Sequence, residues 1–362
     1  MQIKFSPKYN ITSKMLNALM RIEAVKRDII HLPLTPLVLK SLRETARLYT
    51  THYSTMIEGN RLAAEQVKEV VKHEGHFAGR ERDEKEVKGY YEALTKVEQI
   101  AASKTLVTEN IIQSIHSLVM AGGKTKAKPT QYRDGQNVIR DSQSGRIVYM
   151  PPESKDVARL MKSMVAWINE AKEIPAPIIA SIAHYQFATI HPYYDGNGRT
   201  ARLLTTLVLH LGGYDLKGLY SLEEYYARNL GAYYEAISIG EHHNYYMGRA
   251  ESDITKWVEY FTEGMAVAFE NVLQRMNESK LQKCPDQSKM MRALDPRQRK
   301  ALELFQDFEI VTSSQIGELF GFKPRTNAQI CKNWVEDGFL QIVDASNRGR
   351  KYRLASKYML KS

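Results

Sequence analysis

The sequence predicts a mainly α-helical protein with one β-hairpin and a small C-terminal unit of three helices and paired strands. Apolar residues recur at helical spacing through most of the first 279 residues, which is the pattern of packed amphipathic helices. Two short β-prone runs flank a turn-rich stretch between residues 129 and 152, as in a hairpin. A polar stretch over residues 280–294 then separates this part from the last segment, where a further domain is expected.

Composition restricts the class of protein. Of the 362 residues, 43% are hydrophobic and 25% are charged, which is the balance of a globular chain and excludes general disorder. No apolar run approaches the roughly 18 residues of a membrane span, and residues 1–8 lack the apolar stretch of a secretory signal. Two cysteines, Cys284 and Cys331, cannot build a disulfide framework. We therefore expect a cytoplasmic location and no membrane partner.

The net charge favours an anionic partner. Lys and Arg number 51 against 41 Asp and Glu, a formal charge of +10. From Cys284 to Ser362 there are 14 basic and 9 acidic residues, so about half of the excess lies in the last fifth of the chain. A nucleotide, a nucleic acid and an acidic protein all remain open as partners.

Helices are expected in order along the first part of the chain, with Gly59-Asn60 and Gly122-Gly123 as stop signals. The expected spans are 36–53, 64–73, 84–101, a helix that opens at Thr108-Glu109, 154–171, 177–190, 199–211 and several more to residue 279. Between them, runs 137–140 and 146–149 form the hairpin around Ser144-Gly145.

The C-terminal segment predicts a winged helix. Helices are expected over 297–308, 313–320 and 325–337, and strands over 339–343 and 351–354 around Asn347-Arg348-Gly349. The predicted domains are a helical region at 1–105, a core at 106–279, a linker at 280–294 and the winged helix at 295–362.

The segment His191-Pro-Tyr-Tyr-Asp-Gly-Asn-Gly-Arg-Thr-Ala-Arg202 lies between two apolar helices and carries the candidate chemistry. Gly196 and Gly198 allow the backbone to approach a phosphate and direct N–H groups at it. The helix that follows adds its positive end. Arg199 and Arg202 share one helix face and suit bidentate phosphate contacts.

Two further residues of this segment suit acid–base and metal chemistry. Asp195 is a hard oxygen ligand of the kind that Mg²⁺ takes from a protein. His191 is the group there whose usual pKa suits proton abstraction near neutrality. The alternative is a polar capping turn with a structural histidine, which explains any one residue but not the cluster. His242-His243 is interpreted as a solvated pair, not a ligand set.

This segment resembles the signature of the Fic family, His-Pro-Phe-x-Asp/Glu-Gly-Asn-Gly-Arg-x-x-Arg, with Tyr193 in place of the usual Phe. The run 184–190 resembles the preceding helix of the family, and the 137–152 hairpin resembles the flap that positions its substrate. The likeness covers roughly Leu106 to Gly264 and implies a Fic-type helical bundle.

The resemblance implies a protein adenylyltransferase that moves AMP from ATP to a Tyr, Thr or Ser hydroxyl of a target protein. His191 would take the hydroxyl proton, and Asp195 would hold Mg²⁺. Phosphate contacts are implied for the residues that follow: Gly196, Asn197 and Gly198 as the anion hole, and Arg199 and Arg202 at the β- and γ-phosphates. Dimers occur in the family, so a homodimer is a further expectation.

The segment Ser54-Thr-Met-Ile-Glu58-Gly-Asn60 resembles the inhibitory motif of the family. Ser54 and Glu58 are four residues apart and share a helix face. The resemblance implies that Glu58 pairs with Arg202 and keeps ATP from binding productively. The alternative is a surface glutamate at a helix end.

Residues 225–234 resemble the helix that lines the nucleotide base, with Asn229 and Tyr233 as the expected contacts, although aromatic residues at this spacing also fit a plain core.

In the winged helix, the third helix offers Arg325, Thr326, Asn327, Gln329, Lys332 and Asn333, and the wing offers Arg348, Arg350 and Lys351. Winged helices bind DNA or dock proteins. The second hypothesis is therefore a DNA-binding regulator with a nucleotide-sensing core.

Overall fold

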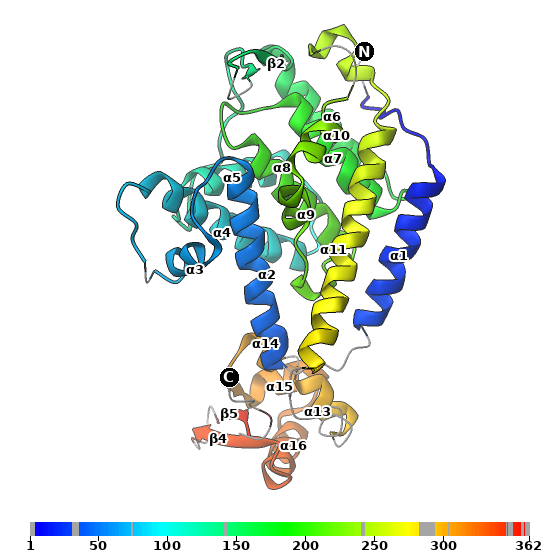
Figure 1. Cartoon of the computed structure of the whole chain (residues 1–362). Helices are drawn as coiled ribbons and strands as arrows, with labels where there is room; N and C mark the ends of the chain where they lie inside the picture. Colours follow the sequence, from blue (N-terminus) through cyan, green and yellow to red (C-terminus); the bar gives the residue numbers. More distant parts are fainter. Residues whose placement is uncertain are drawn as a thin grey trace. The chain divides into compact units, whose positions relative to one another are not determined.

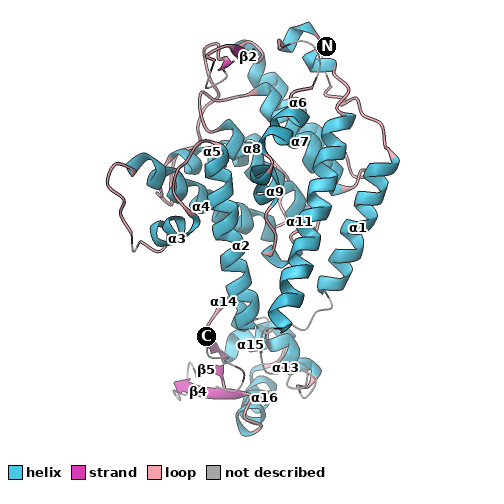
Figure 2. Cartoon of the chain, in the orientation of Figure 1, coloured by secondary structure: helices cyan, strands magenta, loops and turns pink. Residues whose placement is uncertain are grey.

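The computed structural model describes most of the chain (Figures 1 and 2). The described residues are 4–30, 36–73, 75–140, 144–239, 243–281, 294–302, 304–344, 346, 350–355 and 358. The chain divides into two compact units, residues 1–30 with 46–274 and residues 31–45 with 275–362. In the described part of the chain, no helix is both long enough and apolar enough to cross a membrane.

Helices make up most of the first unit, as the sequence predicts (Figure 2). In chain order, the α-helices up to the C-terminal segment are α1 Ser13–Ile30, α2 Pro36–Ile57, α3 Ala64–Val71, α4 Glu81–Ala102, α5 Glu109–Met120, α6 Ser154–Glu170, α7 Ala176–Ile190, α8 Asn197–Leu211, α9 Leu222–Arg228, α10 Leu230–Ile237 and α11 Thr255–Leu281. Three short 3₁₀ turns are η1 Leu216–Gly218, η2 Tyr245–Met247 and η3 Arg249–Glu251.

The core of this unit lies around α7 and α8, which pack against each other. Nearly every residue of α7 is buried, because its sequence is apolar on all sides and other helices cover it. Helix α8 also contacts α4 and α5. The chain segment that joins α7 to α8 therefore has rigid helices on both sides.

Local sequence explains where several helices begin and end. The Thr108 hydroxyl accepts a hydrogen bond from the Ile111 N–H at 3.2 Å and caps α5. The Ser221 hydroxyl caps α9 in the same way. Helix α2 ends at Ile57, and Gly59 follows in the left-handed region with a φ of 90°. Glycine tolerates that conformation at little cost, so the chain turns sharply there.

The predicted hairpin is present as β1 Ile139–Arg140 and β2 Ile147–Tyr149, which pair antiparallel. Just beyond β2, the Met150 N–H donates to the His243 carbonyl at 2.7 Å, and the Tyr245 N–H donates to the Met150 carbonyl at 3.0 Å. The base of the hairpin is thus held by the chain before η2. Ile147 and Val148 remain 42% and 41% exposed on the hairpin itself.

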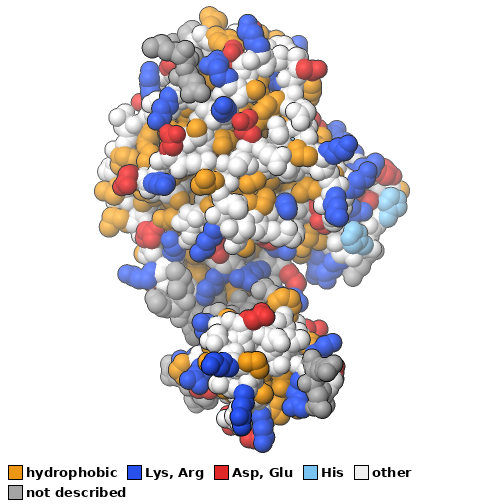
Figure 3. Space-filling view, turned by 180° about the vertical axis from the view of Figure 1, so that it is seen from behind, with side chains coloured by type: hydrophobic (Ala, Val, Ile, Leu, Met, Phe, Trp, Pro, Cys, Tyr) orange, Lys and Arg blue, Asp and Glu red, His pale blue; other side chains and the backbone are white. Residues whose placement is uncertain are grey.

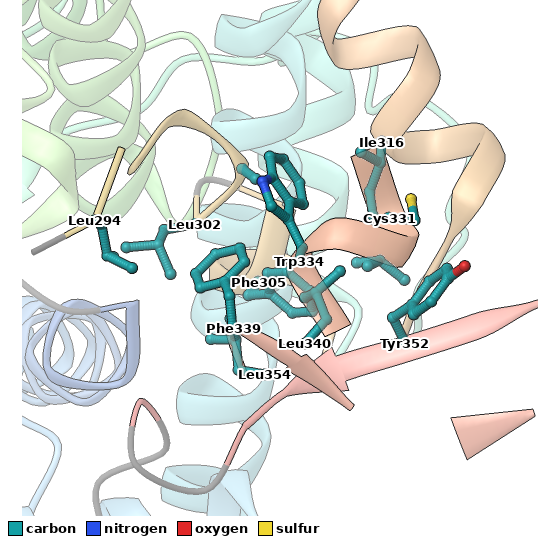
Figure 4. Packing of buried hydrophobic residues seen from close by; sticks show 12 residues of the cluster. Leu294, Leu302, Phe305, Ile316, Cys331, Trp334, Phe339, Leu340, Tyr352 and Leu354 are labelled. Carbon is teal, nitrogen blue, oxygen red and sulfur yellow. The ribbon is translucent and has the colours of Figure 1, made fainter. Parts of the chain in front are cut away.

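The second unit contains the C-terminal segment. Its elements after α11 are α13 Pro296–Ala301, α14 Leu304–Asp307, β3 Val311–Thr312, α15 Ser313–Phe320, α16 Pro324–Glu336, β4 Leu340–Asp344 and β5 Lys351–Leu354. The strands form an antiparallel sheet in the order β3-β5-β4. Trp334 of α16 and Phe339 pack edge to face at the centre of the core of this unit, with centroids 5.4 Å apart (Figure 4).

The prediction of a mainly helical fold is confirmed, and the differences are local. Helix α1 was not expected from the sequence, and neither was the short strand β3. Helix α8 begins at Asn197, two residues before the expected start, and residues 225–234 are split between α9 and α10. The helix expected over 297–308 is two short helices, α13 and α14. Four predicted features, Cys284, His242, Arg348 and most of the linker, lie outside the described residues.

Candidate active site

The loop from His191 to Gly196 is shaped by two residues in the left-handed backbone region. His191 has a φ of 51° and ends α7, and its N–H donates to the Phe187 carbonyl at 2.9 Å. Gly196 has a φ of 74° and is the N-cap of α8. Because Gly196 has no side chain, the first-turn N–H groups of α8 have no side-chain cap from it. The start of α8 therefore has the form of an anion site.

Asn197 braces the loop through its side chain. Its Oδ1 accepts a hydrogen bond from the Tyr193 N–H at 3.0 Å, and its Nδ2 donates to the Tyr193 carbonyl at 2.8 Å. Both ends of the amide are used, and the residue is only 3% exposed. Asn197 can therefore offer an anion its backbone N–H, whereas its side chain fixes the shape of the loop.

Asp195 is the exposed carboxylate of the site. Its side chain is 61% exposed, while Arg199 beside it is only 3% exposed. One oxygen, Oδ1, accepts hydrogen bonds from the Gly196 N–H at 2.6 Å and from Arg199 Nη2 at 3.3 Å. An exposed hard oxygen donor beside a phosphate-type anion site fits Mg²⁺, which keeps most of its ligands as water and phosphate oxygens. No group of three or more His, Cys, Asp or Glu side chains gathers into a metal cluster within the described ranges.

Arg202 is enclosed by the end of α2. Its Nε donates to the Ser54 hydroxyl at 2.7 Å, and its Nη2 donates to the Ser54 carbonyl at 2.9 Å and to Glu58 Oε1 at 2.8 Å. Ser54 is fully buried. Burial is the largest single effect and acts to lower the pKa of Arg202, but the Glu58 carboxylate together with Tyr233 and Tyr90 holds that pKa above its usual value. Arg202 is therefore a permanent cation held by one hydroxyl, one carbonyl and one carboxylate.

The Glu58 carboxylate also lies against the first turn of α8. A Cβ placed on Gly198 would overlap Glu58 Oε1 and lie 3.2 Å from Arg202 Nη1. The carboxylate thus occupies the positive end of the helix, in contact with the glycine backbone where a phosphate oxygen is expected. A cavity of about 230 Å³, bounded by residues that include Glu58, Gly59, Arg61 and Arg80, opens beside it.

His191 is held neutral by its surroundings. Burial is the largest effect and lowers its pKa to about 4, and the Arg133 charge acts in the same direction. A hydrogen bond with the backbone of Ala188 and the carboxylates of Glu58 and Asp195 act in the opposite direction. At neutral pH the imidazole is therefore unprotonated and able to accept a proton.

Arg133 contacts this loop, although no sequence pattern singles it out. Its Nε donates to the His191 carbonyl at 3.0 Å, and its backbone N–H donates to the Pro192 carbonyl at 2.9 Å. It is 4% exposed. A lone arginine ahead of a hairpin has no periodicity or spacing that would reveal it.

His116 of α5 supports the loop from the other side. Its Nε2 lies 2.9 Å from the Asp195 carbonyl oxygen, and its ring stacks on Tyr193 with centroids 3.6 Å apart. Burial lowers the pKa of His116 to about 4, so it acts as a neutral packing group. It lies within a helical apolar stripe, which hides it from motif analysis.

The two residues expected at the nucleotide base have local roles in this structure. The Asn229 side chain accepts a hydrogen bond from the Ala232 N–H at 3.1 Å and caps α10. Tyr233 is 3% exposed, and its hydroxyl lies 3.0 Å from Nε2 of the buried His184. Tyr234, which was not predicted, is 47% exposed and donates to the Ile57 carbonyl at 3.3 Å, at the end of α2. Base contacts by Asn229 and Tyr233 stay a prediction.

Comparison with known proteins finds relatives of this chain. Residues 106–209 match the model of the Fic/DOC family. The chain is 31% identical over 195 residues to the protein adenylyltransferase Fic of Nematostella vectensis, covering 52% of this chain and 44% of that protein. It is 30% identical over 224 residues to the protein adenylyltransferase fic-1 of Caenorhabditis elegans, covering 60% and 42%.

Solved structures share the fold. A Fic family protein from Desulfovibrio desulfuricans has a TM-score of 0.62 at 23% identity, covering 97% of this chain and 98% of that one. A Fic domain containing signaling protein from Bacteroides thetaiotaomicron has a TM-score of 0.60 at 23% identity, covering 74% and 98%. The chain thus contains a Fic/DOC family domain on a Fic-type helical fold. It spans less than half the length of the curated relatives it matches.

Proposed function

We propose that the chain is a Fic-type protein adenylyltransferase that moves AMP from ATP to a Tyr, Thr or Ser hydroxyl of a target protein. The observation that carries the proposal is the loop between α7 and α8. A neutral His191 lies four residues before Asp195. The helix α8, with its first-turn N–H groups, begins two residues after Asp195, at Asn197. The names of the matched relatives support the same activity.

In the proposed reaction, the target hydroxyl oxygen attacks the α-phosphorus of ATP. A new oxygen–phosphorus bond forms as the bond from that phosphorus to the leaving pyrophosphate breaks. His191 accepts the hydroxyl proton, which its neutral state above about pH 4 allows. This step needs no other base, because the imidazole is neutral and lies near enough to Glu58 and Asp195 for both carboxylates to act on its pKa.

The chain holds the triphosphate by charge and position. The first-turn N–H groups of α8 at Asn197 and Gly198 would bind phosphate oxygens, with Gly196 providing the turn that exposes them. Arg199 and Arg202 would neutralise the outer phosphates. Asp195 would hold Mg²⁺, a cofactor that would supply positive charge to the phosphates.

We propose further that Glu58 inhibits the reaction by occupying the phosphate site. Its carboxylate pairs with Arg202 and lies against Gly198. A γ-phosphate could therefore bind Arg202 only after it had displaced the Glu58 carboxylate. The cavity beside Glu58 offers space for the carboxylate when it leaves. Ser54 keeps the arginine in place in either state.

The decisive experiment uses intact mass spectrometry. The Glu58→Gly variant is incubated with ATP and Mg²⁺, and the masses of the chain itself and of added candidate proteins are measured. We expect a gain of one AMP on some chain, and no gain with Glu58→Gly/His191→Ala. A gain that survives His191→Ala would contradict the role of the histidine, and no gain on any protein would contradict transferase activity.

A second candidate function concerns residues 295–362, which we interpret as a winged helix. Helix α16 exposes Arg325, Gln329 and Lys332, and Lys351 and Arg353 are exposed on β5. Basic side chains also lie on this unit at the foot of Figure 3, with hydrophobic ones beside them. Asn327 was expected on the same face, but it is 5% exposed and donates to the Ser313 carbonyl.

These exposed cations favour DNA as a partner, and the half-exposed Ile342 and Val343 of β4 favour a protein. A titration of duplex DNA at several salt concentrations separates the two, because phosphate contacts give a steep loss of affinity with salt. Loss of binding in Arg325→Ala/Lys351→Ala would support DNA, and absence of salt-dependent binding would leave a protein-docking module. The cytoplasmic location and a homodimer stay predictions.

A further inference from the structure

Arg133 joins the His191 loop to both ends of the hairpin. Its guanidinium donates to three backbone carbonyls: His191 at 3.0 Å, Gly135 at 2.8 Å, and Pro152. Gly135 lies just before β1 and Pro152 lies just after β2. The side chain is 4% exposed, and each of its three guanidinium nitrogens donates to the main chain. No other described residue of the site contacts the loop and both hairpin ends in this way.

The carbonyl that Arg133 holds belongs to a strained residue. His191 has a φ of 51°, in the left-handed region that is unfavourable for a residue with a side chain. The conformation turns the chain out of α7, so it determines where the imidazole points. A strained backbone persists only where its surroundings hold it, and the hydrogen bonds at the His191 and Pro192 carbonyls are contacts of that kind.

We propose that Arg133 is a positioning residue, which fixes the imidazole of His191 and the hairpin in one geometry so that the acceptor hydroxyl meets the base. The inference rests on the proposed transferase function and adds a residue to it. Among the described residues, the Arg133 guanidinium donates to His191, Gly135 and Pro152 and not to the residues of the proposed phosphate site. Its effect should therefore fall on the rate of transfer and not on ATP binding.

The chemistry of the fork makes lysine a poor substitute. A guanidinium directs donors in fixed directions to three carbonyls at once, whereas an ammonium is a point charge on a flexible stem. Arg133→Lys keeps the charge near His191 and loses the geometry. Arg133→Gln loses both. Comparison of these two variants therefore separates the effect of Arg133 on position from its effect on charge.

The charge effect has a definite sign. Arg133 lowers the pKa of His191, while Glu58 and Asp195 raise it. Removing the cation in Arg133→Gln should raise the pKa of the base, so the acid limb of the rate profile moves to higher pH. Arg133→Lys should leave that limb in place, because the positive charge remains.

The test measures initial rates of AMP transfer in the active Glu58→Gly background, with Arg159→Lys as the matched control. Arg159 is an exposed arginine of α6, outside the site and the hairpin, whose Nη2 donates to Asp156 Oδ1 at 2.7 Å. We expect Arg133→Lys to lower kcat by about 10- to 100-fold, because small misplacements of a catalytic group have effects of that size. ATP affinity should stay within about twofold, since positioning is separate from ATP binding.

Equal kcat in Arg133→Lys and Arg159→Lys, with a rate that still depends on His191, would overturn the positioning role alone. A rate that is absent already in the Glu58→Gly background would instead refute the proposed function.

Should the Arg133 variants not fold, Tyr194→Phe replaces them. The exposed Tyr194 hydroxyl accepts from the Gly135 N–H at 2.8 Å and donates to Asp134 at 2.7 Å, so it joins the same two segments. Loss of that link should lower kcat, and an unchanged kcat would contradict the proposal.

Discussion

The Arg202 and Glu58 side chains meet at 2.8 Å, yet Arg202 is 1% exposed and Glu58 is 31% exposed. The pair is therefore asymmetric. Arg202 is held by two contacts to Ser54 as well, so it stays in place when the pair opens. Glu58 follows the end of α2 and has a cavity beside it. Only the carboxylate is free to leave, which makes it the movable part of the proposed inhibition.

Substitutions of Glu58 should therefore give graded activation. Glu58→Gly removes the anion and the side chain, and we expect AMP incorporation to rise by about tenfold or more, the scale of one lost charge-assisted contact. Glu58→Gln keeps the shape without the charge and should give a smaller rise. Incorporation of labelled ATP measures both. Equal labelling by the wild type and Glu58→Gly would eliminate inhibition by this residue.

Gly198→Ala should be coupled to Glu58. A Cβ at position 198 would overlap Glu58 Oε1, so the carboxylate must move away from Arg202. We expect the free energy of unfolding to fall by about 1–2 kcal/mol in the wild type, and by clearly less in the Glu58→Gly background. Thermal or urea unfolding of the four proteins gives the coupling energy.

Gly231→Ala is the matched control for that cycle. Its Cβ would meet only Asn229 Oδ1 at 3.8 Å, an ordinary contact in α10. It should have the same effect on stability with and without Glu58. Identical behaviour of the two alanine variants would show that Gly198 and Glu58 are not in contact.

Tyr193→Phe should be neutral or stabilising. Tyr193 is 2% exposed and stacks on His116, while its hydroxyl oxygen is buried and has no hydrogen-bond partner in the described part of the chain. A buried hydroxyl without a partner costs about 1–3 kcal/mol, so its removal should raise the melting temperature or leave it unchanged. AMP transfer should be retained. A large loss of stability would show that the hydroxyl has a partner, such as a buried water.

Acid should destabilise the first unit well above the pH range of carboxylate titration. Burial lowers the pKa of His116, His191 and His210 to about 4 and that of His184 to about 3. The unfolded chain binds these protons near pH 6.5, so unfolding is favoured increasingly as pH falls below that value. This stability is fully present above about pH 6.5 and is lost toward about pH 4.

Melting temperatures measured between pH 8 and pH 4 test this expectation. His184→Gln should flatten the dependence on pH, because the amide can serve the same neighbours without titrating. Its contacts are the Thr205 hydroxyl at 2.9 Å and the Tyr233 hydroxyl at 3.0 Å. A melting temperature that stays constant down to pH 4.5 would contradict the low pKa values.

Helical periodicity was enough to predict most of the fold, because an amphipathic pattern and a capping residue are local properties. Thr108 and Gly59 fixed one beginning and one end in this way. Helix α1 was missed, although it packs beside α11 (Figure 1), where Arg21 pairs with Glu263 at 2.8 Å and Glu270 at 2.7 Å. Those pairs join residues more than 240 positions apart, which no local pattern reports.

The candidate site divides in the same way. The residues from His191 to Arg202 are contiguous, so the chemistry of this segment could be predicted from the sequence. The residues that support the loop are not contiguous with it. Arg133 and His116 come from other segments of the chain, and their roles follow only from their contacts with the loop in the folded structure. The use of the Asn197 side chain as a brace also depends on the tertiary turn that brings it to Tyr193.

The order of the elements along the chain has a consequence for biosynthesis. Glu58 follows directly after α2 and leaves the ribosome before α8, whose Arg202 lies 144 residues later. Under the proposed inhibition, the Glu58 carboxylate is therefore present before the phosphate site at the start of α8 can form. A newly made molecule would then never pass through an unrestrained interval in which it could label bystanders, and activation would require a later event that draws one side chain aside.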